Sequence, residues 1–139
     1  MLKDILLPCI ALVGLTAIIW LIALHARITE MRLRKLSSQS VATMRDISQL
    51  LQNTRASDNF SNLFELPVLF YMLCIALVVT HAESTAYVTT AWIFVALRIA
   101  HSLIQVTYNR VSHRLICWLL STLCLFGMWG KFAADRIFA

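Results

Sequence analysis

An asparagine, a glutamate and a proline stand close together in an otherwise apolar stretch, as Asn62-x-x-Glu65-x-Pro67. A spacing of three residues puts Asn62 and Glu65 on the same face of a helix. Proline has no N–H group, so the carbonyl of Leu63 would lose its helical donor beside that pair. Because a charge near hydrocarbon is costly, a glutamate in such a segment predicts a functional site.

A second polar pattern follows, with spacings of three and four residues that keep its members within roughly 80° of one helix face. Its members are Arg98, His101, Gln105, Tyr108 and Ser112. A stripe of this kind would be costly against lipid, so we expect it to face the interior of a helix bundle. Two interpretations stay open. The stripe binds a ligand, or it forms a structural network in which Arg98 neutralises Glu65, and a resting ion pair of that kind could open to a ligand.

The elements that must position these residues are membrane-spanning helices. The chain has 139 residues, and its apolar runs are each about 20 residues long, enough to cross a hydrocarbon core of roughly 30 Å. We expect an all-α, integral membrane four-helix bundle that forms a single membrane domain over residues 1–139. The expected spans cover residues 5–24, 60–79, 86–108 and 115–136. The first is too long for the core of a cleavable signal peptide, so we expect it to remain as a span.

The long connection between the first two spans, residues 25–59, is strongly basic. Apolar residues recur there at helix-like spacing, which predicts that the second helix begins outside the membrane. They are Val41, Met44, Ile47 and Leu51. If that helix is continuous, Arg55 and Asp58 fall within about 80° of the face that carries Asn62 and Glu65.

The formal net charge is +5, and the basic residues lie mostly between the spans. This distribution indicates contact with anionic membrane lipid, and no motif typical of nucleic-acid binding is present. By the positive-inside rule, the first and third connections are cytoplasmic and both termini lie outside. Arg27, Arg110 and Arg114 then lie at the same cytoplasmic surface as the Asn62–Glu65 face.

The cysteines all fall inside apolar runs, at Cys9, Cys74, Cys117 and Cys124. Cysteine in such surroundings usually packs as a small apolar side chain. The sequence has no CxxC motif, so we predict no metal site, no redox motif and no disulfide framework.

Several arginines beside an amide and a carboxylate suit a zwitterionic ligand that carries more than one carboxylate. Guanidinium groups bind carboxylates through two hydrogen bonds, and a glutamate can hold an ammonium. If the ligand carries a thiol, nearby arginine charge would lower the pKa of that thiol and increase its thiolate fraction. The second substrate would come from the lipid, because such a site opens between helices.

Taken together, these features resemble the MAPEG family, the membrane-associated proteins in eicosanoid and glutathione metabolism, and they resemble its bacterial-type members most. The resemblance rests on four spans, the long first connection, Asn62-x-x-Glu65-x-Pro67 at the start of the second span, and Arg98 with its polar stripe in the third. It covers nearly the whole chain. It implies a homotrimer, glutathione bound between adjacent subunits at the cytoplasmic side, and a lipophilic electrophile or hydroperoxide as second substrate.

The resemblance also implies roles for particular residues. Asn62 and Glu65 match the glutathione-contacting pair, Arg27 the basic residue that ends the first span, and Arg98 the arginine of the third span. Asp58 stands where better-known members have an arginine, and His101 and Gln105 stand near positions where they have tyrosines. We predict Arg98 and Arg110 as catalytic residues. The predicted glutathione ligands are Arg27, Arg55, Asn62, Glu65, His101, Gln105, Tyr108 and Arg114.

Two functions are therefore open. The first is a membrane-bound glutathione S-transferase or peroxidase that conjugates or reduces a lipophilic small molecule. The alternative is a non-catalytic or transporter-like four-helix membrane protein that uses Glu65 as a buried structural or proton-coupled carboxylate.

Overall fold

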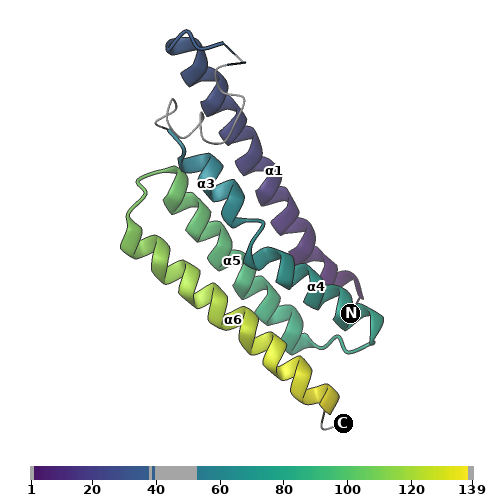
Figure 1. The fold of residues 1–139 in the computed structure, drawn as a ribbon. Helices are drawn as coiled ribbons and strands as arrows, with labels where there is room; N and C mark the ends of the chain where they lie inside the picture. Colours follow the sequence, from purple (N-terminus) through teal and green to yellow (C-terminus); the bar gives the residue numbers. More distant parts are fainter. Residues whose placement is uncertain (1, 38, 40–52, 138–139) are drawn as a thin grey trace.

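The computed structural model describes residues 2–37, 39 and 53–137 of the chain, and its regular elements in this part are helices. They are α1 (Leu2–Leu33), α3 (Arg55–Asn62), α4 (Leu66–Val79), α5 (Thr85–Val106) and α6 (Val111–Ile137), as Figure 1 shows. Within the described residues, four helical stretches are long and apolar enough to cross a membrane. They are Lys3–Leu33, Arg55–Val79, Thr85–Val106 and Val111–Ile137. The prediction of an all-α four-helix membrane bundle is thus confirmed.

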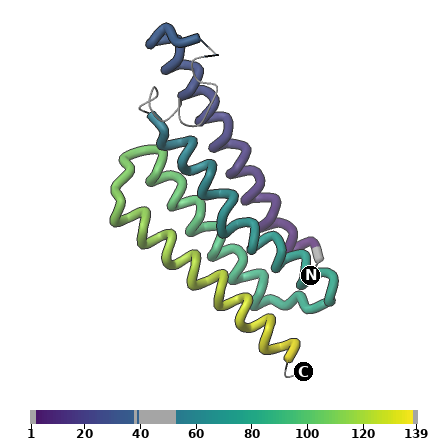
Figure 2. The backbone as a smooth tube through the Cα atoms, viewed as in Figure 1, coloured from purple at the N-terminus to yellow at the C-terminus, as the bar shows by residue number. Residues whose placement is uncertain are grey.

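The helices lie side by side along one common direction, and the two ends of the chain lie at the same end of the bundle (Figure 2). Helix α5 is central, since it contacts α1, α3 and α6. Helix α4 continues the direction of α3 and packs against α1 and α6. Residues on α5 can therefore meet side chains from three other helices.

Helix α1 is much longer than the predicted first span of residues 5–24. Its 32 residues extend about 48 Å at 1.5 Å per residue, beyond a hydrocarbon core of about 30 Å. In Figure 1 its last turns project past the ends of the other helices. Glu30 in that projection accepts hydrogen bonds from Arg34 at 2.9 Å and from the backbone N–H of Asn53 at 3.1 Å. The helical pattern predicted for Val41, Met44, Ile47 and Leu51 lies outside the described residues.

The second span is broken rather than kinked. Helix α3 ends at Asn62 and α4 begins at Leu66, with Glu65 in the turn at φ −92° and ψ −101°. Pro67 lies in the first turn of α4, where its missing N–H leaves no helical bond unmade. Pro67 has no N–H to donate to the carbonyl of Leu63, and its ring would clash with that carbonyl, which disfavours a continuous helix through this stretch. The prediction that Asn62 and Glu65 share one helix face is therefore wrong.

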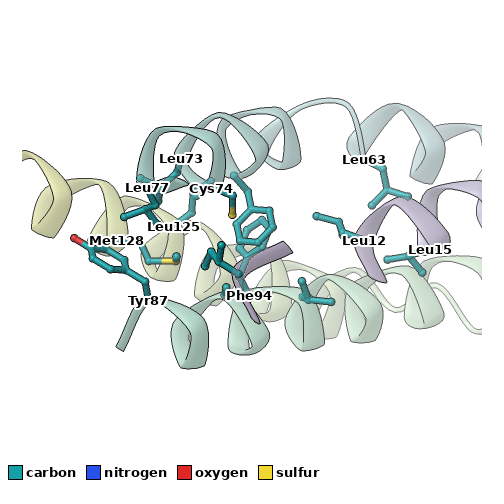
Figure 3. Close-up of a cluster of buried hydrophobic side chains, with 14 of the residues drawn as sticks. Leu12, Leu15, Leu63, Leu73, Cys74, Leu77, Tyr87, Phe94, Leu125 and Met128 are labelled. Carbon is teal, nitrogen blue, oxygen red and sulfur yellow. The ribbon is translucent and has the colours of Figure 1, made fainter. Parts of the chain in front are cut away.

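On the α4 side of this break, an apolar core holds α4 against α5 and α6 (Figure 3). Phe70 and Phe94 stack with ring centroids 4.6 Å apart, and both are fully buried. Leu73, Leu77 and Leu125 are fully buried beside them. The outside of the bundle carries large exposed apolar side chains, among them Ile10, Leu21, Ile75 and Leu123. This distribution is what a surface in contact with lipid requires.

Candidate functional site

Arg98 lies inside the bundle on α5 with 0% of its surface exposed. Its Nη2 donates a hydrogen bond of 2.9 Å to the backbone carbonyl of Asn62, the last residue of α3. That carbonyl is left without a helical donor because α3 stops there. The Nε and Nη1 groups of Arg98 have no hydrogen-bond partner among the described residues. A buried guanidinium in this condition is costly, and it favours the approach of an anion.

Glu65 does not neutralise Arg98 directly. The turn between α3 and α4 leaves Glu65 exposed on the surface of the chain, and the ion pairs formed among the described residues do not include it. The two charges still influence each other through space. The direct ion pair considered from the sequence is absent from this part of the structure, so the charge of Arg98 stays largely uncompensated.

Next to Arg98, a hydrogen-bonded chain of side chains joins α3, α5 and α6. The Nδ2 of Asn62 donates to the Oε1 of Gln105 at 3.1 Å, and the same oxygen lies 3.0 Å from the Nε2 of His101. The Nδ1 of His101 lies 3.1 Å from the backbone carbonyl of Arg114. Both ring nitrogens of His101 thus face oxygen atoms, and the tautomer of the ring decides which of them donates. The ring then joins the polar stripe of α5 to the first turn of α6.

A cavity of about 280 Å³ opens beside these hydrogen-bonded side chains, between α3, α5 and the start of α6. Its wall combines an amide, an imidazole and a guanidinium with apolar side chains. The lining residues are Asn62, His101, Val111, Arg114, Leu115 and Trp118. Arg114 is held in place by a 3.0 Å hydrogen bond from its Nη1 to the Oδ1 of Asn109. Positive charge and hydrogen-bond donors at an apolar wall suit an anionic, partly apolar ligand.

Arg27 lies elsewhere, in a second hollow of about 350 Å³ between α1 and α3. This hollow is lined by Trp20, Ala23, Leu24, Arg27, Ser57, Phe60 and Ser61. Helix α3 contributes residues to both the hollow and the cavity. The chain therefore carries Arg27 and Asn62 in two separate recesses that share α3.

A model of the MAPEG family matches residues 5–134 of the chain. The chain belongs to the MAPEG family. The family includes glutathione transferases and peroxidases, and its members use glutathione. No curated protein and no solved structure matched the chain. The resemblance seen in the sequence is thus confirmed at the level of the family.

In this MAPEG protein, the cavity is lined by three of the predicted ligands, Asn62, His101 and Arg114, and Tyr108 and Arg55 are among those that lie apart from it. Helix α5 ends at Val106, so the chain turns away before Tyr108 and that residue leaves the polar stripe. Tyr108 is 58% exposed, and its hydroxyl pairs with the Nδ1 of His113 at 3.1 Å. Arg55 donates from Nη1 to the carbonyl of Thr107 at 2.9 Å. Arg110 is exposed in the turn directly before Val111, at the rim of the cavity.

The sequence did not single out Asn59, and it did not single out Ser102 as its partner. Both side chains are fully buried. The Oγ of Ser102 donates to the Oδ1 of Asn59 at 3.1 Å, and the Nδ2 of Asn59 lies 3.5 Å from the carbonyl of Ser102. Asn59 stands three residues before Asn62, and this helical spacing is the feature of the sequence that could have identified Asn59. The pair fixes α3 on α5 and so sets the position of Asn62 relative to Gln105.

Proposed function

We propose that this MAPEG protein is a membrane-bound glutathione S-transferase or peroxidase acting on a lipophilic electrophile or hydroperoxide. The observation that carries the proposal is Arg98, a fully buried guanidinium whose Nε and Nη1 are unbonded among the described residues. It lies directly behind Asn62, which lines a cavity that also contains His101 and Arg114. Glutathione brings the carboxylates that such a set of groups would attract.

The chemistry follows from the groups around the cavity. Arg114 and the amide of Asn62 bind and orient the peptide, and Glu65 is placed at the surface turn to hold its ammonium. Positive charge from Arg98 and from Arg110 at the rim increases the thiolate fraction of the glutathione thiol. In conjugation, the thiolate forms a carbon–sulfur bond, and the leaving group departs or the adduct takes up a proton. In peroxide reduction, two glutathione molecules become a disulfide while the hydroperoxide becomes an alcohol and water.

We propose that the working assembly is a homotrimer in which glutathione lies between subunits. Asn62 faces the cavity between α3 and α6, whereas Arg27 lies in the hollow between α1 and α3. In a ring of subunits with α3 and α4 near the axis, the hollow of one subunit meets the cavity of the next, so that Arg27 completes a neighbouring site. The whole chain acts as one membrane domain, with the first and third connections in the cytoplasm and both termini outside.

The proposal is tested by turnover of the protein purified in detergent. We expect glutathione-dependent conjugation of a hydrophobic aryl halide, or reduction of a lipid hydroperoxide, that falls in Asn62→Ala and Arg114→Ala. Arg136→Gln, at the opposite end of α6, serves as the matched control and should keep full activity. If the wild-type protein neither conjugates nor reduces any substrate of these two classes, the enzymatic proposal is overturned.

One observation favours the transporter-like alternative. The second span is discontinuous at Leu63–Glu65, and broken helices with polar groups at the break are typical of secondary transporters. The structure leaves Glu65 exposed on the single subunit rather than buried. This alternative predicts pH-dependent efflux from reconstituted vesicles that is abolished by Glu65→Gln, whereas the transferase proposal predicts no efflux.

A further inference from the structure

Two of the four cysteines meet where α1 packs against α4. Cys9 on α1 and Cys74 on α4 are far apart in the sequence, and a hydrogen bond joins their side chains. All four cysteines of the chain are free thiols in this structure. Because the sequence has no CxxC motif, the packing of α1 on α4 is what brings these two sulfur atoms together.

A second polar contact fixes the register of α1 and α4. The hydroxyl of Tyr71 on α4 is hydrogen-bonded to the hydroxyl of Thr16 on α1. Thr16 itself donates to the carbonyl of Leu12 at 2.9 Å, so its oxygen is left to accept from Tyr71. The two helices run in opposite directions (Figure 1). Thr16 lies about two turns after Cys9 and Tyr71 about one turn before Cys74, so both contacts lie along the same helix–helix seam.

The two thiols differ in access from outside the bundle. Cys74 is 1% exposed and lies in the apolar core (Figure 3). Cys9 is partly exposed and is followed by Ile10, which is 64% exposed on the outside of the bundle. The Sγ of Cys9 donates to the carbonyl of Ile5 at 3.6 Å, so its sulfur accepts from the thiol of Cys74. A reagent dissolved in the lipid therefore meets Cys9 first, with Cys74 directly behind it.

We infer that Cys9 and Cys74 are a redox-active dithiol that reduces a lipid hydroperoxide and closes to a disulfide between α1 and α4. The sulfur of Cys9 attacks the terminal oxygen of the hydroperoxide. The O–O bond breaks, and the alkoxide takes the proton of Cys9 and leaves as an alcohol. The sulfur of Cys74 then forms the S–S bond with the sulfenic acid of Cys9, and the departing hydroxide takes the proton of Cys74 to become water. The two thiols supply the two electrons.

The arrangement matches what this reaction requires. Redox-active cysteines are accessible and stand next to a resolving cysteine, as Cys9 stands next to Cys74. Cys124 has a different kind of partner, since its Sγ donates to the carbonyl of Thr90 at 3.4 Å. The inference goes beyond the proposed function, because the reaction needs no glutathione. Neither Cys9 nor Cys74 lines the cavity at Asn62 or the hollow at Arg27.

The test exposes the reduced protein in phosphatidylcholine nanodiscs to a long-chain fatty acid hydroperoxide, without glutathione. Peptide mapping by mass spectrometry under non-reducing conditions should find Cys9 joined to Cys74, with one hydroxy fatty acid formed for each disulfide. Dithiothreitol should restore both thiols. Cys9→Ala should abolish the oxidation of Cys74, which the oxidant reaches only through Cys9. Cys74→Ala should leave Cys9 as a sulfenic acid that dimedone traps.

The matched control is the double variant Cys117→Ala and Cys124→Ala, which removes the two partly buried thiols of α6. It should form the Cys9–Cys74 disulfide to the same extent as the wild type. No reaction in the wild type, disulfides between chains, or even oxidation of all four cysteines would each overturn the inference. The wild-type map alone decides among these outcomes, whether or not the single variants fold. Glutathione is absent throughout, so failure here leaves the proposed enzyme standing.

Discussion

The two ends of the bundle each carry a cluster of polar and charged side chains, and they are organised in opposite ways. Near the end of α6, Asp135 accepts from Lys131 at 2.8 Å and from the hydroxyl of Tyr87 at 3.0 Å, and Lys131 lies 5.4 Å from the centre of the Tyr87 ring. The opposite charges of Lys131 and Asp135 neutralise each other within one chain. Toward the other end, Arg98 is fully buried, and its Nε and Nη1 are unbonded among the described residues.

We propose that this difference separates a structural cluster from a ligand site. The Asp135 cluster gains nothing from a further ligand, because its donors and acceptors are already matched. The Arg98 cluster holds a charge at a cost to the folded subunit, and an anion would offset that cost. An ionisable residue inside a membrane span is by default a functional-site hypothesis, and Arg98 is such a residue.

The largest expected effect is from Arg98→Met. Methionine keeps an unbranched apolar chain and removes the uncompensated charge, so we expect the thermal stability in detergent to hold or rise. Glutathione-dependent kcat/KM should fall on the order of 100-fold, equivalent to about 2.7 kcal/mol. Steady-state kinetics and thermal unfolding of the same preparation measure both quantities.

Arg98→Lys is the companion variant, because it retains the charge without the planar fork. It should recover part of the lost activity. Parallel loss of stability and activity in Arg98→Met would mean that Arg98 is structural, and the contrast between the two clusters would disappear.

A smaller effect is expected at the amide of Asn62, which lines the cavity. Asn62→Ala removes the donor to Gln105, and we expect the apparent KM for glutathione to rise roughly tenfold, as for loss of one hydrogen bond to a charged ligand. Asn59→Ala is the informative comparison, since Asn59 is bonded to Ser102 and does not line the cavity. It should lower stability more than Asn62→Ala does, and an equal effect of the two on KM would contradict the assignment.

The helix break offers a third test. Pro67→Ala permits the helix to continue through residues 63–66, which would withdraw the carbonyl of Asn62 from Arg98 into a helical hydrogen bond. We expect a several-fold loss of glutathione turnover with little change in helix content by circular dichroism. Unchanged turnover would show that the break is fixed by packing at Leu63, which is 1% exposed, rather than by the proline.

The smallest effect is expected from Asp135→Asn. The carboxylate of Asp135 is solvent-exposed, and exposed ion pairs spaced four residues apart contribute little to stability. The thermal midpoint should fall slightly and glutathione turnover should not change. A marked loss of turnover would show that the two ends are coupled, and Lys131→Gln would then identify whether the same ion pair carries the coupling.

The sequence predicted the four apolar helices and the burial of Arg98, His101 and Gln105, because both follow from helical periodicity. The predictions made from the sequence failed at the ends of helices. Tyr108 lies beyond the end of α5, and Glu65 lies in a break of the second span, so neither follows the periodicity of the helix before it. The break at Glu65 follows from the local effect of Pro67, whereas the pairing of Asn59 with Ser102 and the cavity formed by the first turns of α6 depend on tertiary contacts.

The central claim is that the uncompensated charge around Arg98 binds glutathione. Isothermal titration calorimetry of the purified wild-type protein with reduced glutathione tests it most directly, with Arg98→Met titrated alongside. The account predicts saturable binding that weakens as salt is raised and is lost in Arg98→Met. An absence of binding to the wild-type protein, or equal binding by the two proteins, would contradict it.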